Sequence, residues 1–172
     1  MSEAGRRALA AIDIGSNSVK MLIASCQPDG TLRQIAQRTE MVRLGAGIDQ
    51  TGRLAEDRIA ATIAALASFT DLARTHGVVQ IVAAATEATR AAENGREFLD
   101  RVRRETGISV EVIDGDREAE LSFRGLSTQF DVGGHSVIAD IGGGSTELIY
   151  AEDGELRKAR SVPVGSRRLT ER

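Results

Sequence analysis

The chain has 172 residues, a hydrophobic share of 41% and a mean hydropathy of −0.17, values typical of a globular protein and not of a disordered one. Its 22 basic and 25 acidic side chains give a net charge of −3, and only 3% of its residues are aromatic, so we expect no nucleic-acid partner. No apolar run approaches the roughly 18 residues that span a bilayer, so we expect no membrane partner either. A single cysteine, Cys26, cannot form an internal disulfide and predicts a cytoplasmic protein.

The first part of the chain predicts three strands joined by tight turns. An apolar strand ends at Asp13, a glycine-containing turn follows, and a second strand runs to about Ala24. Asp29-Gly30 then marks a hairpin turn into a third strand, and this unit ends near Leu44.

The middle of the chain predicts alternating helices and strands. Ile59, Ile63 and Leu66 recur at helical spacing. We expect helices over 55–75, 96–105 and 116–129, a helical turn over 86–93, and strands over 78–84 and 110–113. This alternation indicates an α/β fold with a mixed sheet flanked by helices.

Residues 138–151 repeat the pattern of residues 11–24, with a strand, an Asp-Ile-Gly turn and a second strand. Asp-Gly turns follow both segments, so we interpret the two units as a duplication. We therefore expect one whole domain over 1–129 and the incomplete start of a second, similar domain, its first three strands, over 130–172. The open edges of that incomplete sheet predict self-association, such as a homodimer.

Each Asp-Ile-Gly turn combines a carboxylate with glycine backbone that a ligand can approach closely. Successive N–H groups in such a turn favour an anion, and a Mg²⁺ ion would offset the repulsion between carboxylate and phosphate. Asp13 and Asp140 are therefore candidate metal ligands. The alternative is that the glycines only form tight turns. The candidate phosphate-binding residues of the two turns are Gly15, Ser16, Asn17, Ser18, Gly142, Gly143, Gly144, Ser145 and Thr146.

These turns resemble the phosphate-binding hairpins of the actin-like ATPase superfamily. More closely, the chain resembles the N-terminal portion of the exopolyphosphatase and guanosine pentaphosphate phosphohydrolase family (Ppx/GppA), from about Ala10 to about Arg168. The motifs that carry the resemblance are A-I-D-I-G-S-N-S-V-K-M-L-I-A, V-R-L-G-x-G, T-E-A-T-R-A-A, G-D-R-E-A and D-I-G-G-G-S-T-E-L.

The resemblance implies two actin-like (ribonuclease H-like) lobes with the active site between them. It implies Mg²⁺-dependent release of terminal phosphate from polyphosphate or guanosine pentaphosphate. The family's catalytic glutamate falls on Glu118, its phosphate-binding arginine on Arg90, and Glu147 joins the metal candidates. The family often has a second acid just before the catalytic glutamate, where this chain has Arg117. Family members continue well past residue 172, so we expect little turnover from residues 1–172 alone.

Several alternatives stay open at this stage. The chain fits an actin-like ATPase or sugar kinase fragment, or a non-catalytic phosphate- or alarmone-binding module. Glu118 fits a charge at a helix N-terminus, Arg90 a surface ion pair with Glu87 or Glu93, and Glu147 a cross-strand salt bridge. The basic residues between 157 and 172 fit a solvated helix start or a polyanion track.

Overall fold

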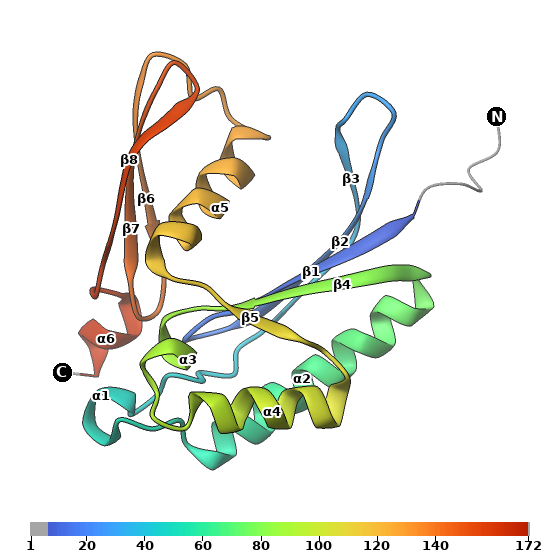
Figure 1. Ribbon diagram of the computed structural model, residues 1–172, viewed down its shortest axis with the longest axis vertical. Helices are drawn as coiled ribbons and strands as arrows, with labels where there is room; N and C mark the ends of the chain where they lie inside the picture. Colours follow the sequence, from blue (N-terminus) through green and yellow to red (C-terminus); the bar gives the residue numbers. More distant parts are fainter. Residues whose placement is uncertain (1–6, 172) are drawn as a thin grey trace.

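The computed structural model describes residues 7–171 and contains two β-sheets joined by helices (Figure 1). The strands are β1 (Ala8–Ile14), β2 (Val19–Cys26), β3 (Leu32–Glu40), β4 (Val78–Ala85), β5 (Val110–Val112), β6 (His135–Ile141), β7 (Thr146–Glu152) and β8 (Glu155–Val162). The helices are α1 (Ile48–Thr51), α2 (Glu56–Thr75), α3 (Glu87–Ala91), α4 (Gly95–Thr106), α5 (Gly115–Ser127) and α6 (Ser166–Thr170).

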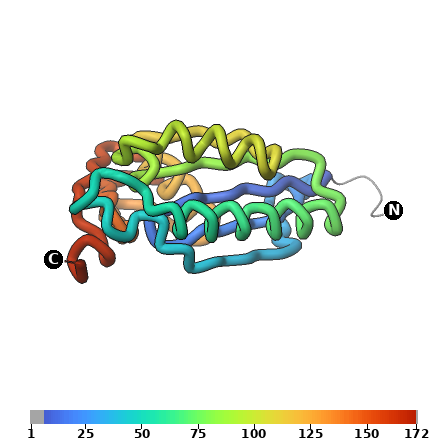
Figure 2. Tube along the Cα trace, turned by 90° about the horizontal axis from the view of Figure 1, so that it is seen from below, coloured from blue at the N-terminus to red at the C-terminus, as the bar shows by residue number. Residues whose placement is uncertain are grey.

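The first sheet has five strands in the order β3-β2-β1-β4-β5. Strands β1, β2 and β3 pair antiparallel, whereas β4 runs parallel to both β1 and β5. Helices α2 and α4 lie together across one face of this sheet, as the view from below shows (Figure 2). The mixed α/β architecture expected from the sequence is thereby confirmed.

The strand β1 shows how the sequence divides the two faces of the first sheet. Its residues alternate strictly between buried and exposed, as a period of two requires. Ile12 and Ile14 point into the core with Leu66 and Phe69 of α2 and Phe98 of α4. Asp13 therefore points to the opposite face, away from the helices.

The second sheet has three antiparallel strands in the order β6-β7-β8. Helix α5 packs on it through a small core of Ala119, Phe123, Ile149 and Ala151. The division of the chain into 1–129 and 130–172 stays a prediction, and α5 lies on the first side of that boundary although it packs on the second sheet.

The outer face of the second sheet is uncovered. Val137 is 79% exposed and Leu148 is 46% exposed. Their counterparts in the duplicated first unit, Ala10 and Met21, are buried beneath α2 and α4. The two units thus share a strand pattern, but within the described residues only the first has helices on this face.

The expected helices and strands of the middle segment all form, and none of their ends is shifted by more than two residues. The short helix α1 lies where only a loop was predicted, and α6 lies in the segment for which a helix start was one of two alternatives. None of the helices among residues 7–171 is long and apolar enough to cross a membrane.

Candidate active site

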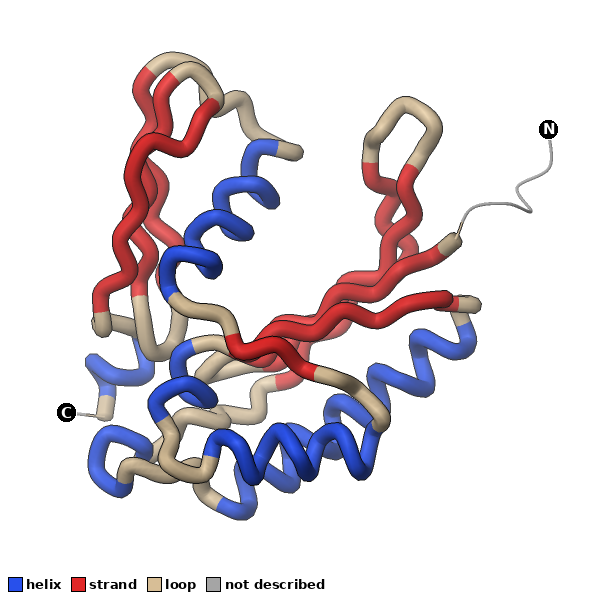
Figure 3. The backbone as a smooth tube through the Cα atoms, viewed as in Figure 1, coloured by secondary structure: helices blue, strands red, loops and turns tan. Residues whose placement is uncertain are grey.

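The two Asp-Ile-Gly turns have the same geometry. The Gly15 N–H donates to the Ser18 carbonyl at 3.0 Å, and the Gly142 N–H donates to the Ser145 carbonyl at 2.9 Å. The turns also face each other: a Cβ added to Gly143 would lie 3.0 Å from the Cβ of Asn17. The repeated sequence therefore builds two matching loops that meet at the base of the two diverging sheets (Figure 3).

A cavity of about 710 Å³ lies between the two sheets, beside these turns. Most of the predicted site residues line it, from both duplicated units and from α5. They are Asp13, Gly15, Ser16, Asn17, Ser18, Glu118, Asp140, Gly142, Gly143, Gly144, Ser145 and Glu147.

Backbone amides supply the anion-binding potential of the turns. Within residues 7–171, the N–H groups of Ser16, Asn17, Gly143 and Gly144 donate to no other protein atom. The Ser16 hydroxyl, by contrast, donates to Glu87 Oε2 at 3.0 Å. The amides, and not the Ser16 hydroxyl proton, are therefore the groups left to bind an anion.

Two carboxylates face each other across strands β6 and β7, where Asp140 and Glu147 are paired residues. Glu147 is only 1% exposed, and it accepts a hydrogen bond from the Ser161 hydroxyl at 2.7 Å. Asp140 accepts one from Ser122. Like charges in directly opposed positions destabilise a sheet, and Glu147 makes no salt bridge across the strands among the described residues. The cross-strand salt bridge considered for Glu147 is thus wrong.

Asp13 and Glu118 complete a set of four carboxyl groups with Asp140 and Glu147. Burial raises the pKa of Asp13, Lys20 lowers it, and Asp140 raises it further. Burial likewise raises the pKa of Glu118 to about 7, with additional contributions from Glu147, Asp13 and Asp140 and an opposing one from Arg90. The charge of Asp140 therefore acts on both Asp13 and Glu118 across the cavity.

Helix α5 and the Arg90 guanidinium position Glu118. Asp114, the N-cap residue of α5, accepts a hydrogen bond from the Arg117 N–H at 2.8 Å, which fixes the first turn of the helix. Glu118 Oε2 is buried, has no hydrogen-bond partner in the described protein, and lies 4.0 Å from Arg90 Nη1. An acid with a raised pKa and an unsatisfied oxygen in a cavity is typical of a catalytic group.

Arg90 and Thr146 are the two predicted phosphate-binding residues that do not line the cavity. Arg90 donates to the Ile113 carbonyl and lies beside Glu118, so the alternative of a surface ion pair with Glu87 or Glu93 is wrong. Thr146 donates its hydroxyl proton to the Val164 carbonyl at 2.5 Å. Both side chains are therefore engaged by protein carbonyls.

The carboxyl groups fit a divalent cation by their chemistry. Mg²⁺ prefers one or two carboxylates together with phosphate oxygens and water. Asp140 and Glu147 are opposed to each other, and neither has a basic partner among residues 7–171, so a bound cation would compensate their charge. Residues 7–171 hold no group of three or more His, Cys, Asp or Glu side chains close enough to enclose an ion unaided.

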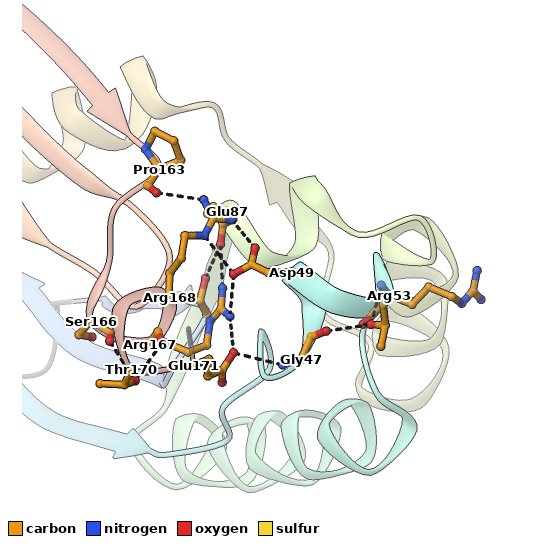
Figure 4. Close-up of polar contacts among 12 residues, drawn as sticks. Gly47, Asp49, Arg53, Glu87, Pro163, Ser166, Arg167, Arg168, Thr170 and Glu171 are labelled. Carbon is orange, nitrogen blue, oxygen red and sulfur yellow. Dashed lines mark hydrogen bonds and ion pairs between the residues drawn. The ribbon is translucent and has the colours of Figure 1, made fainter.

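Sequence reasoning missed Glu87 and misjudged the basic segment at the end of the chain. Arg167 is buried. Arg168 pairs with Glu87 and Asp49 (Figure 4), so the basic residues of α6 form neither a solvated helix start nor a polyanion track. The available signal was the position of Glu87 just beyond the carboxyl end of β4, the edge at which the turns also lie.

Two matching hairpin units that face each other across a cleft define an actin-like fold. Comparison with known proteins assigns the family: the model of the Ppx/GppA phosphatase family matches residues 22–172. The chain belongs to this family.

Relatives with names and solved structures agree. Exopolyphosphatase 2 of Mycobacterium tuberculosis is 39% identical over 95% of this chain and 54% of its own length. Guanosine-5'-triphosphate,3'-diphosphate pyrophosphatase of Vibrio vulnificus is 34% identical over 96% of this chain and 33% of its own length. The Ppx/GppA family member of Aquifex aeolicus superposes with a TM-score of 0.83 at 40% identity, over 96% of this chain and 54% of that structure. The chain thus spans about half or less of the length of these relatives.

Proposed function

We propose that this chain supplies the phosphate-binding turns and the general base of a Mg²⁺-dependent phosphohydrolase that releases terminal phosphate from a polyphosphate chain or from guanosine pentaphosphate. The observation that carries the proposal is the meeting of two amide-bearing glycine turns and four carboxyl groups in one cavity. The names of the two relatives support both substrate classes.

The backbone amides of the turns hold the terminal phosphate in this mechanism. Hydrolysis of a phosphoanhydride depends mostly on positioning and charge stabilisation. The free N–H groups of Asn17, Gly143 and Gly144 come from both units, so they can surround one phosphate group from two sides.

Glu118 acts as the general base. Its pKa of about 7 leaves a large deprotonated fraction at neutral pH and gives it the basicity to accept a proton from an attacking water. Arg90 lies beside Glu118 and stabilises its ionised form. A bound Mg²⁺ would offset phosphate charge, and Asp13, Asp140 and Glu147 are the residues that would hold it, directly or through water.

Phosphate release by the complete gene product tests the proposal. Polyphosphate and guanosine pentaphosphate are supplied separately, each with Mg²⁺ and with a chelator. We expect Mg²⁺-dependent release from at least one of them, and a rate that rises with pH up to about 7 as Glu118 deprotonates. Glu118→Gln removes the base and is expected to lower the rate about 10²–10⁴-fold.

Glu120→Gln is the matched control, because Glu120 lies two residues along the same helix and pairs with Arg117 and Arg124. It should retain most of the activity. Full activity of Glu118→Gln would remove this residue from the mechanism. Activity with ATP and an acceptor sugar, and with neither of the proposed substrates, would instead indicate a kinase.

A further inference from the structure

The geometry points to Glu87 as a positioning residue that holds the two phosphate-binding turns in register, by binding the Ser16 hydroxyl of the first turn and Arg168 behind the second turn at the same time. This inference rests on the proposed function only for what the turns bind. The placement of the turns can be measured without any ligand.

Glu87 joins segments that are distant in sequence. Its Oε2 accepts the Ser16 hydroxyl at 3.0 Å, 71 residues away, and its Oε1 accepts Arg168 Nη2 at 2.7 Å, 81 residues away. The residue is only 8% exposed. A buried carboxylate that accepts one hydrogen bond from each unit connects the units in a way that no local contact can.

Gly144 shows how closely Glu87 approaches the second turn. A Cβ added to Gly144 would collide with Glu87 Oε2, and it would lie 2.8 Å from the Ser16 hydroxyl oxygen. The carboxylate therefore lies against the backbone of one turn while it binds the side chain of the other. Any movement of Glu87 must shift the amides on either side.

Helix α6 transmits the contact with Arg168 to the second turn. The Ser166 N–H donates to the Gly142 carbonyl at 2.9 Å, and the Arg167 N–H donates to the Gly143 carbonyl at 3.0 Å. A side chain at Gly165 would collide with the Gly143 backbone, so the start of α6 lies directly on the turn. The hydrogen bond from Arg168 to Glu87 thereby fixes the position of the second turn, to which α6 is attached.

Arg168 is held at every nitrogen of its guanidinium. Nε and Nη2 donate to Asp49 at 3.2 and 2.8 Å, and Nη1 donates to the Pro163 carbonyl at 3.1 Å (Figure 4). A guanidinium with a fixed orientation presents its remaining donor to Glu87 in one direction only.

The same cluster is not an anion site. Arg167 and Arg168 are surrounded by Asp49, Glu87 and Glu171, so the group carries no excess positive charge. Its role is to join the units, and phosphate binding is left to the turns.

The first test uses ligand-free chain of 172 residues and its backbone amide resonances. Glu87→Gln keeps the shape of the side chain, but its amide NH2 group only donates, so the side chain can accept a hydrogen bond from Ser16 or from Arg168 and not from both. We expect Glu87→Gln to shift the backbone amide resonances of Asn17 in the first turn and of Gly143 and Gly144 in the second. Glu97→Gln, the same change at an exposed helix position, should leave them in place.

The second test measures affinity for tripolyphosphate in the presence of Mg²⁺ by calorimetry. Loss of a charge-assisted hydrogen bond predicts about tenfold weaker binding in Glu87→Gln. Ser16→Ala breaks the same connection, so the double variant should bind no more weakly than the weaker single variant.

Unchanged backbone amide resonances of the two turns in a folded Glu87→Gln chain would overturn the inference. So would a double variant whose loss of affinity for tripolyphosphate is the sum of the losses in the single variants. If Glu87→Gln does not fold, the Ser16→Ala variant tests the inference instead. This variant must shift the amide resonance of Gly144, and an unshifted resonance rejects the connection between the two turns through Glu87. Failure of the parent chain to bind tripolyphosphate would count against the proposed function, while the amide shifts still decide the role of Glu87.

Discussion

At the scale of single residues, Glu118 shows how burial converts an ordinary acid into a base that works near neutral pH. Desolvation is the largest cause of its raised pKa, and the nearby Glu147 is the next. The folded chain therefore binds a proton at Glu118 more tightly than the unfolded chain does. Between pH 4.5 and about 7 the ionisation of this residue lowers the free energy of unfolding as the pH rises.

Replacement of Glu118 by Gln should stabilise the chain at pH 8 and have little effect at pH 5, where Glu118 is mostly protonated in the folded state. We expect a gain in the free energy of unfolding of about 1–2 kcal/mol at pH 8, after allowance for partial screening by solvent. Urea unfolding of both chains at the two pH values measures it. A gain of the same size at pH 5, or one shared by Glu97→Gln, would contradict this origin.

Among the secondary-structure elements, the glycine turns and helix α5 differ in whether their glycines have room for a side chain. Gly144 has no room for a side chain because Glu87 and Ser16 lie against it. Gly125, in the last turns of α5, is exposed and has open space where a Cβ would be. The cost of a methyl group therefore depends on the element in which the glycine lies.

Glycine-to-alanine replacements at these two positions should change stability in opposite directions. Gly144→Ala is expected to lower the free energy of unfolding by about 1–3 kcal/mol, because the backbone or Glu87 must move. Gly125→Ala should raise it by about 0.5–1 kcal/mol through helix propensity. Thermal and urea unfolding of the two variants provide the comparison, and equal effects at both sites would show that the collision at Gly144 is relieved without cost.

At the scale of the whole molecule, the two units differ in what covers them. The core of the first unit is closed by α2 and α4, whereas among residues 7–171 the second sheet has only α5, on one face. Its other face presents Val137, Ile141 and Leu148 to solvent. A contiguous apolar face of this kind favours association.

We accordingly expect the 172-residue chain to self-associate through the outer face of β6 and β7, since the same face of β8 carries Lys158 and Arg160. Val137→Lys places a charge on that face and should shift the chain toward monomer. Leu32→Lys, at an exposed position on β3, is the control. Sedimentation velocity over a concentration series gives the distribution. A parent chain that is monomeric throughout, or an equal response to the control, would argue against this surface.

The local features of this protein follow from short stretches of its sequence. The repeated Asp-Ile-Gly pattern was enough to predict two matching turns, because a hairpin turn depends on the few residues within it. Periodicity likewise predicted the helices and strands of the middle segment. The resemblance to the family predicted Glu118 as the catalytic glutamate. Each of these features depends on residues that are close together in the sequence.

Features that depend on distant segments arise from the folded arrangement and could not be predicted from the sequence. Nothing near Glu87 in the sequence indicates that Ser16 and Arg168 bind it. Nor does the sequence indicate that Asp49 and Glu87 pair with Arg168 of α6, for which a solvated helix start and a polyanion track were the two predictions. The same holds for the pKa of Glu118, which results from burial and from carboxylates on other strands. Burial and charge pairing are set by which elements meet in space, and that outcome belongs to the packing of the whole chain.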